Sequence, residues 1–221
     1  MCGRFTLSQS TDVIASAFNL TQIPPLELRY NIAPTQPIPA ILSVPKQGNE
    51  LQMLRWGLIP SWAKDLSIGA KLINARAETV SEKPSFKSAF KRRRCLIIAD
   101  GFYEWQRQEG KKQPYYFRVQ NSQLFAFAGL WEHWQSPDEQ IINSCTILTT
   151  EANDLLRPIH DRMPVILDPK SYDLWLDSEV QNPELLQPLL HPYQANLMTS
   201  FAVSSKVNNP RNNTPECINS L

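Results

Sequence analysis

The stretch "CLIIADGFYEW", residues 95–105, contains the clearest fold signal in the chain. Its first half is a short apolar run, and its second half alternates aromatic and polar side chains. Gly101 separates the halves, so we predict one strand that passes through a glycine bend into a second strand. Alternation along the second strand places Phe102 and Glu104 on one face and Tyr103 and Trp105 on the other.

Further strands and short helices are predicted on both sides of this stretch. Strands are predicted at 37–44 and 51–59 joined by a turn at 46–50, at 113–120 and 124–132 forming a hairpin around 121–123, and at 142–150, 163–167 and 197–205. Helices are predicted at 11–18, within 81–94, at 151–159 where Pro158 ends or distorts it, at 168–176 and at 182–190. Residues 207–221 read as a polar, irregular tail. Strands in hairpins with scattered helices indicate an α+β fold built on an antiparallel sheet or open barrel.

Length and composition are those of an ordinary soluble domain. The chain has 221 residues, of which 42% are hydrophobic and 19% charged. We find no apolar run long enough to span a membrane and no secretory signal. The formal net charge is +1, lower than that of a generic nucleic-acid binder, so any nucleic-acid binding requires a local basic patch. Of the 22 basic residues 12 are arginine, whose guanidinium binds phosphate through two parallel donors and suits it better than a lysine ammonium.

The cysteines favour a reduced protein in the cytoplasm. Cys2, Cys95, Cys145 and Cys217 include no C-x-x-C pair, so we expect no zinc site. Cys95 and Cys145 lie in apolar predicted strands and are interpreted as buried thiols. We therefore predict cytoplasmic localisation.

Four short motifs mix polar groups with apolar neighbours at the ends of predicted elements. They are "CGRF" at 2–5, "NARAET" at 74–79, "ADGFYEW" at 99–105 and "IHDRMP" at 159–164. Cys2 is small enough for Met1 to be removed, which would leave a terminal cysteine with an α-amine and a thiol on adjacent carbons. Phe5 and Leu7 alternate as in a strand, which indicates a terminus that is held in place.

Each motif also has a structural interpretation. Asn74 could occupy a turn, although "LINARAET" has no glycine or proline, and a buried asparagine needs hydrogen-bond partners. Glu104 is either on an outward face or a buried carboxyl with a raised pKa. His160 could cap a helix end. The basic run at 91–94 is most often a solvated face, with Arg94 the member expected to point inward, and His133 and His191 are taken as structural.

In this order and at these spacings, the four motifs resemble the SRAP family, the SOS-response-associated peptidase-like or abasic-site processing proteins. The resemblance extends from Cys2 to "AVSSKVNN" at 202–209. It implies a single α+β domain over 1–221, with a mostly antiparallel, open β-barrel-like core and flanking short helices. It also implies covalent capture of abasic sites in single-stranded DNA. We expect a monomer that needs no cofactor or metal.

The resemblance assigns roles to eight residues of this chain. Cys2 would form the crosslink, and Asn74, Glu104 and His160 would complete the active site. The side chains expected to meet DNA are the phosphate-facing Arg4, Arg76 and Arg162, and Trp62 of "IPSWAKD" as a base-stacking or strand-separating wedge.

The chemistry of a terminal cysteine supports this assignment independently. The α-amine has an ordinary pKa of about 7.7–8, so much of it is free base at neutral pH and can form an imine with the aldehyde of an opened abasic sugar. The adjacent thiol can then close a five-membered thiazolidine ring at high effective molarity. Glu104 could shuttle protons, Asn74 could hold the aminothiol or a sugar hydroxyl, and His160 could protonate the sugar oxygen, reverse the link or assist β-elimination.

Two other functions compete with this one. An N-terminal cysteine near a base and an asparagine also suits a cysteine amidohydrolase or self-processing peptidase, in which Met1 would be the only residue to remove. A non-catalytic reader of damaged bases would suit the aromatic residues, yet it gives no reason for a terminal aminothiol. Abasic single-stranded DNA analysed on a denaturing gel separates the three.

Overall fold

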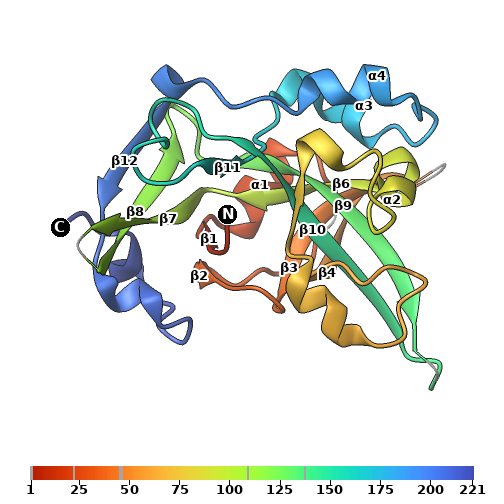
Figure 1. Cartoon of the computed structure of the whole chain (residues 1–221), viewed down its shortest axis with the longest axis horizontal. Coiled ribbons are helices and arrows are strands. Elements are labelled where there is room, and N and C mark those ends of the chain that lie inside the picture. Colours follow the sequence, from red (N-terminus) through yellow and green to blue (C-terminus); the bar gives the residue numbers. More distant parts are fainter. Residues whose placement is uncertain (1, 22, 45–46, 109, 137) are drawn as a thin grey trace.

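A five-stranded barrel forms the core of the computed structural model, which describes residues 2–21, 23–44, 47–108, 110–136 and 138–221. Among these residues the barrel strands follow the order β10-β4-β3-β6-β9, and β9 also pairs with β10, which closes the ring (Figure 1). The strands are β3 (Pro37–Val44), β4 (Gly48–Trp56), β6 (Arg94–Ala99), β9 (Phe125–Gln135) and β10 (Ile141–Glu151). Two short strands, β5 (Asn74–Arg76) and β11 (Arg162–Pro164), pair with β10 outside the ring. The α+β class and the barrel-like core are confirmed.

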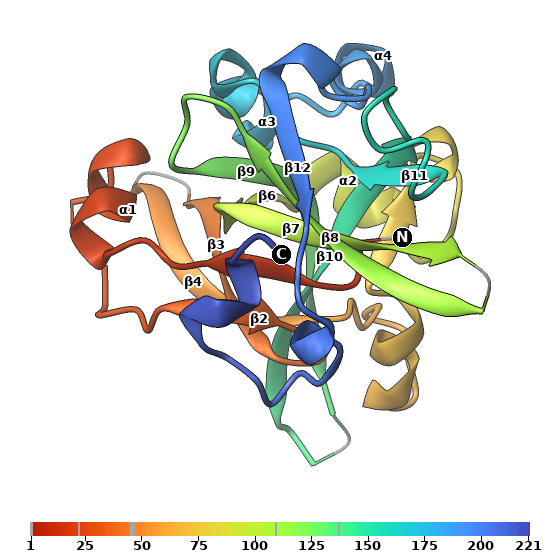
Figure 2. The ribbon, with the colours of Figure 1, turned by 90° about the vertical axis from the view of Figure 1, so that its left-hand side faces the viewer.

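A second, antiparallel sheet lies beside the barrel, and the chain passes directly from barrel strand β6 into it (Figure 2). Its strands are, in order, β12 (Met198–Ala202), β8 (Lys111–Val119), β7 (Gly101–Gln108), β1 (Phe5–Leu7) and β2 (Arg29–Ile32). Strand β6 ends at Ala99 and β7 begins at Gly101, so the predicted strand–bend–strand is confirmed. Gly101 is required here because a Cβ atom would lie 2.1 Å from the Tyr116 hydroxyl.

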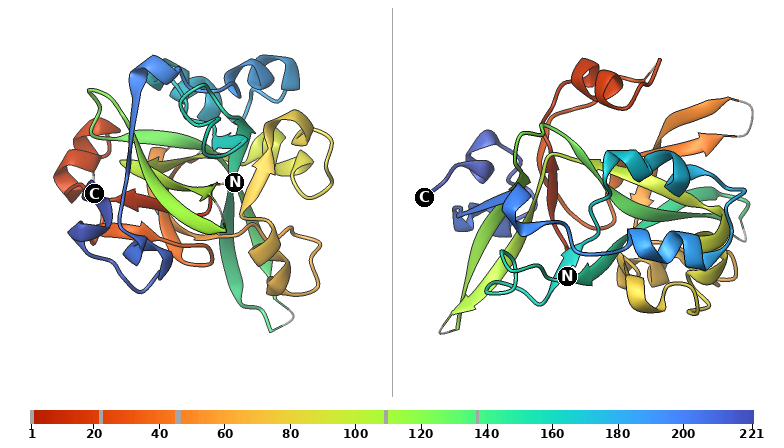
Figure 3. Two further views of the ribbon diagram at one scale, coloured as in Figure 1. Left: turned by 60° about the vertical axis from the view of Figure 1, so that its left-hand side comes forward. Right: turned by 90° about the horizontal axis from the view of Figure 1, so that it is seen from above.

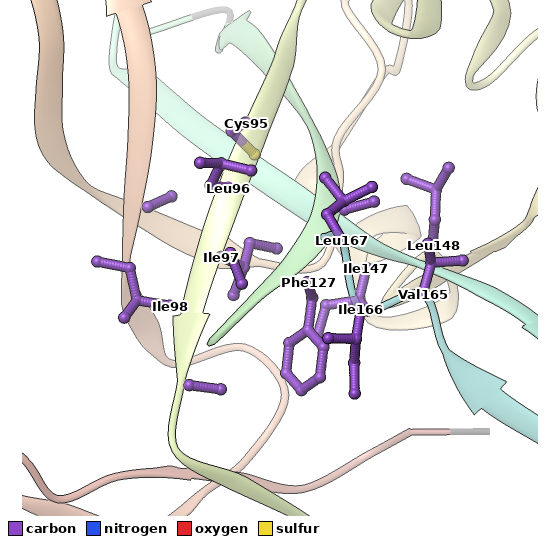
Figure 4. Close-up of a cluster of buried hydrophobic side chains, with 14 of the residues drawn as sticks. Cys95, Leu96, Ile97, Ile98, Phe127, Ile147, Leu148, Val165, Ile166 and Leu167 are labelled. Carbon is purple, nitrogen blue, oxygen red and sulfur yellow. The ribbon is translucent and has the colours of Figure 1, made fainter. Parts of the chain in front are cut away.

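Apolar side chains of the barrel strands meet inside the ring. Ile97, Phe127 and Ile147 are fully buried and lie together in Figure 4. Phe5 of β1 extends this core, since its ring packs edge-on against Trp56 at 5.2 Å and Phe127 at 5.8 Å between ring centroids. Complete burial of such a ring contributes about 1.5–3 kcal/mol. The start of the chain is therefore anchored by the core only three residues after Cys2.

Short helices cover the outside of the barrel, with α1 on a different side from the others (Figure 3). The α-helices are α1 (Thr11–Ala17), α2 (Lys87–Arg92), α3 (Tyr172–Leu176) and α4 (Pro183–Leu186), and short 3-10 turns are η1 (Leu66–Lys71), η2 (Ala77–Thr79), η3 (Pro169–Ser171), η4 (Gln187–Leu189), η5 (Ala195–Leu197), η6 (Ser205–Asn208) and η7 (Pro215–Ile218). Arg94 is buried and donates to backbone carbonyls within α2 and α3, including Phe90 at 2.8 Å and Trp175 at 2.6 Å. The expectation that Arg94 points inward is confirmed, and its role is structural.

The predicted hairpin of 113–120 with 124–132 is wrong. Strand β8 pairs with β7 and β12, whereas β9 pairs with β6 and β10, so the chain crosses from one sheet to the other at 120–124. The true hairpin joins β7 to β8 past Gly110, whose φ of +81° suits a tight turn. Phe102 then stacks on Phe117 with ring centroids 5.2 Å apart. Long-range aromatic packing decided this pairing. Lys46, in the predicted turn at 46–50, lies outside the described residues.

The predicted helix at 151–159 is also wrong. Strand β10 continues to Glu151, and residues 154–159 form successive turns. The Asn153 carbonyl accepts from the backbone N–H groups of both Leu156 and Arg157, which closes a single turn. Pro158 has no N–H to extend it. These turns bring His160 to the start of β11.

The C-terminal tail is more ordered than its polar composition predicts. Residues 205–208 and 215–218 form the 3-10 turns η6 and η7. Val207 and Cys217 are buried, and Val207 belongs to a small apolar cluster with Tyr103, Tyr116 and Val203. The tail is therefore fastened to the outer face of the second sheet. All four cysteines are free and buried, as predicted for Cys95 and Cys145. Across the described ranges, no helix is long and apolar enough to cross a membrane.

Candidate active site

Cys2 lies just before β1, and Asn74 holds its backbone. Asn74 donates from Nδ2 to the Cys2 carbonyl oxygen at 2.8 Å. It begins β5, where it pairs in parallel with Ile147 of β10, so a barrel strand sets its position. The Asn74 Oδ1 atom is buried and has no hydrogen-bond partner among the described residues. It can therefore accept a hydrogen bond from a bound hydroxyl or amine. Met1, whose removal is expected, lies outside the described residues.

The Cys2 thiol is fully buried and protonated. Burial raises its pKa far above the ordinary thiol value, and the negative charge of Glu104 raises it further. A nucleophilic cysteine normally has a depressed pKa, set by neighbouring cations or a helix N-terminus. Cys2 therefore enters a reaction as S–H and needs a group that takes its proton.

Glu104 has the properties expected of a group that takes this proton. It lies on β7, is 3% exposed, and has a pKa raised to about 7, chiefly by burial, while the positive charge of the amino terminus opposes the rise. The prediction of a buried carboxyl with a raised pKa is thus supported by geometry. At neutral pH both protonation states of Glu104 are populated, which suits a residue that moves protons.

His160 faces the same cavity from the start of β11. In a neutral ring with its hydrogen on Nε2, the Nδ1 atom accepts the backbone N–H of Arg162 at 3.0 Å. The Asp161 carboxylate lies 3.0 Å from the same Nδ1 and favours the charged ring. Burial outweighs this and lowers the pKa of His160, so the neutral ring dominates at neutral pH.

The cavity lined by Glu104 and His160 has a volume of about 600 Å³ and is rich in cations. Its lining residues are Arg4, Glu104, Trp105, Arg107, Lys112, His160 and Asn208. The Arg4 guanidinium lies 5.8 Å from the centre of the Trp105 ring. Arg107 and Lys112 face each other as a cross-strand pair on β7 and β8. Two like charges in this position repel each other, and a bound anion would relieve the repulsion.

The other predicted DNA-binding residues lie outside this lining. Arg76 is exposed at the end of β5, and Arg162 is on β11, and both of these short strands pair with β10. Arg162 donates through both Nη atoms to the Glu78 carboxylate, at 2.7 and 2.9 Å. Trp62 is 59% exposed on the loop after β4. The structure thus joins Arg4 to the cavity, and leaves the DNA contacts of Arg76, Arg162 and Trp62 as predictions.

Sequence reasoning missed Arg107, Lys112 and Asn208 as cavity residues. The signal for the first two was available, because "RQEGKK" at 107–112 places basic residues around a glycine turn. Asn208 had no such signal, since only tertiary packing brings the tail to β7. A larger cavity of about 710 Å³ lies near Ser8, Asp100, Tyr116 and Arg118, and none of the eight predicted site residues is among its described lining. In the described ranges, no group of three or more His, Cys, Asp or Glu is placed to bind a metal ion.

Comparison with known proteins shows similarity over the whole chain. The family model described as SOS response associated peptidase (SRAP) matches residues 1–210. Abasic site processing protein YoqW of Bacillus subtilis (strain 168) is 50% identical over 224 residues, covering 100% of both chains. Abasic site processing protein HMCES of Xenopus tropicalis is 38% identical over 220 residues, which are 86% of this chain and 65% of that protein. A crystal structure of a protein from Bacteroides thetaiotaomicron has 26% sequence identity and a TM-score of 0.87, with 100% of both chains covered.

Proposed function

We propose that this chain, which belongs to the SOS response associated peptidase (SRAP) family, processes abasic sites in single-stranded DNA by capturing them covalently on Cys2. One observation carries the proposal: Asn74 holds the backbone of Cys2 at 2.8 Å beside a buried Glu104 that titrates near neutral pH. The cavity next to them is lined by three cations, which suits a DNA backbone. In this proposal the protein acts as a cytoplasmic monomer after Met1 is removed.

The reaction begins at the amine of Cys2. Its lone pair forms a bond to C1 of the ring-opened sugar, and the carbinolamine loses its hydroxyl as water to give an imine. The thiol then adds across the C=N bond: sulfur bonds to C1, and its proton moves to nitrogen through Glu104. The product is a thiazolidine, and no other reactant is consumed. Because the amine and thiol share one residue, the second step is intramolecular and fast.

Neighbouring residues have matching roles. Neutral His160, with hydrogen on Nε2, can donate that proton to the sugar oxygen as the ring opens. Asn74 Oδ1 can accept from the amine or a sugar hydroxyl. Arg4, Arg76 and Arg162 would bind phosphates, and Trp62 would stack on a base next to the site.

The competing peptidase function starts from a thiolate. The burial that raises the pKa of Cys2 disfavours a thiolate, whereas it does not prevent an attack by the amine. The amine-first reaction is therefore the better match to this site. A self-processing activity limited to Met1 is compatible with both.

The decisive test extends the chain by residues before Cys2 that cells cannot remove. The thiol is retained, but its nitrogen becomes a non-nucleophilic amide. We expect the extended protein to fold, to bind single-stranded DNA, and to form no heat-stable band with an abasic oligonucleotide on a denaturing gel. A cleavable leader of the same length is the control, and the adduct should appear after cleavage. Equal crosslinking by the uncleaved protein contradicts the mechanism, and hydrolysis of a test peptide at the rate of cleaved protein supports the peptidase.

A further inference from the structure

The C-terminal strap, defined here as residues 203–217, is tied to the site by one buried asparagine. Asn31 of β2 is 2% exposed. Its Nδ2 group donates to three strap carbonyls, those of Val207 at 3.1 Å, Asn209 at 3.0 Å and Asn212 at 2.8 Å. Because the two hydrogens of this buried amide are shared among three strap carbonyls, the strap is fixed against β2.

The other end of the same amide holds Arg4. Arg4 Nη1 donates to Asn31 Oδ1 at 2.7 Å and to the Val207 carbonyl at 2.8 Å. In the described part of the chain, Arg4 Nη2 has no recorded hydrogen-bond partner, and Nε is buried without one. Both hydrogen bonds that hold the guanidinium are therefore made by Nη1. Asn31 accepts one of them, and it donates to the Val207 carbonyl that accepts the other. Nη2 is left available to an anion in the cavity.

A second cavity residue depends on the strap. The Trp105 indole Nε1 donates to Asn208 Oδ1 at 2.7 Å, and the Arg4 guanidinium lies 5.8 Å from the centre of the Trp105 ring. Arg4, just before β1, and Trp105 of β7 thus reach the cavity from the N-terminal half of the chain, yet both are bonded to residues near its other end. The strap therefore helps to orient two residues of the cavity lining, and its own Asn208 lines the cavity.

We propose that Asn31 is a positioning residue that holds Arg4 in the orientation for a DNA phosphate and couples this orientation to the strap. This inference rests on the proposed function only for the identity of the anion. Without Asn31, the Arg4 side chain would have to order itself as DNA binds, which costs conformational entropy. The Asn31 side chain itself need not touch DNA.

The test is a double-mutant cycle between Asn31 and Arg4. Asn31→Leu removes the acceptor for Arg4 and the donors to the strap, and Arg4→Met removes the charge. We expect each single variant to weaken binding of a single-stranded oligonucleotide with a tetrahydrofuran abasic analogue by about tenfold, and to reduce the salt slope by about one. The double variant should bind no more weakly than Arg4→Met, because Asn31 acts through Arg4. Independent, multiplying losses would overturn the proposal, as would unchanged binding by Asn31→Leu.

Asn31→Asp keeps the test decisive if Asn31→Leu does not fold. Its carboxylate still accepts from Arg4 but offers no hydrogens to the three carbonyls. We expect faster amide hydrogen exchange in 203–217, with the salt slope retained. Asn213→Ala is the matched control, since Asn213 accepts from the Tyr30 N–H at 2.7 Å and has no recorded bond to Arg4. It should leave the salt slope unchanged.

Two outcomes separate this proposal from the proposed function. Unchanged exchange of the strap in Asn31→Asp overturns the role of Asn31 whatever happens to DNA. Coupled binding losses in the variants, together with no covalent adduct in the wild-type protein, contradict the proposed function and support the role of Asn31.

Discussion

Two buried carboxylates lie on either side of the same glycine bend and are used differently. Asp100 precedes Gly101 and is 6% exposed, and Glu104 follows it on β7 and is 3% exposed. Asp100 accepts from the Ser8 backbone N–H and hydroxyl, both at 2.6 Å, and from the Thr6 hydroxyl. Glu104 has a pKa raised to about 7, because burial outweighs the hydrogen bonds that it receives.

The difference shows how donors decide what a buried carboxyl does. Three donors directed at Asp100 brace β1 against the bend, and Thr6 also contacts the Tyr116 hydroxyl at 2.8 Å. Glu104 has less compensation, so its proton is exchangeable near neutral pH. The cavity beside Asp100 is the larger one, yet its described lining contains none of the predicted site residues, whereas the smaller cavity is lined by Arg4, Glu104 and His160.

Isosteric amide substitutions should separate the two roles, and they give the largest expected effect. Glu104→Gln should slow adduct formation on saturating abasic DNA by on the order of 10²-fold, because a proton shuttle is lost. DNA affinity should be largely retained. The measurement is single-turnover crosslinking, with the dissociation constant for the abasic analogue determined in parallel.

Asp100→Asn is the matched comparison on the other side of the bend. It should lower the free energy of unfolding by about 2 kcal/mol, since an amide cannot accept from all three donors as a carboxylate does. The crosslinking rate of the folded fraction should be unchanged. If both substitutions slow the reaction equally at equal folded fraction, the contrast between brace and shuttle is wrong.

Stability should respond to pH through Glu104. Its pKa is about 7 in the folded chain against an ordinary value of 4.5, so between these values the folded state holds a proton that the unfolded state has released. The contribution of this bound proton to the free energy of unfolding is therefore lost as pH rises from about 4.5 to about 7. The total loss is about 3 kcal/mol. Denaturant unfolding from pH 5 to 8 should show Glu104→Gln gaining stability relative to wild type. If the stabilities of the two proteins changed in parallel with pH, the raised pKa of Glu104 would be contradicted.

A third, exposed carboxylate should give the smallest effect. Glu78 is 50% exposed and holds Arg162 in a two-bond ion pair. Glu78→Gln should change stability by less than about 1 kcal/mol, as for other exposed pairs. It should raise affinity for single-stranded DNA about threefold, because Arg162 is released for phosphate. Glu82→Gln makes the same charge change nearby without a recorded bond to Arg162. An equal gain in both variants would indicate net charge alone.

Local pattern accounts for much of what could be predicted. The strand–bend–strand at 95–105 follows from an apolar run, a glycine and alternation, and α1 follows from its Ser10 cap and apolar spacing. The four motifs identified Cys2, Asn74, Glu104 and His160. In the fold, Glu104 and His160 line one cavity, and Asn74 holds the backbone of the buried Cys2. Strand pairing was less predictable, since β8 and β9 are adjacent in sequence yet lie in different sheets. Which strands pair is decided by side-chain packing that local pattern does not contain.

The sequence by itself determined that residue 2 can provide an amine and a thiol together, and that the polar motifs belong to one family. Only the tertiary structure decided their environment. Burial gives Glu104 its raised pKa, and Asn74 reaches the Cys2 backbone from β5, 72 residues away in the chain. Arg4 is held by a carbonyl 203 residues along the chain. Propensity and spacing act over a few neighbouring residues, whereas solvation and hydrogen-bond partners are set by whatever the complete fold places alongside.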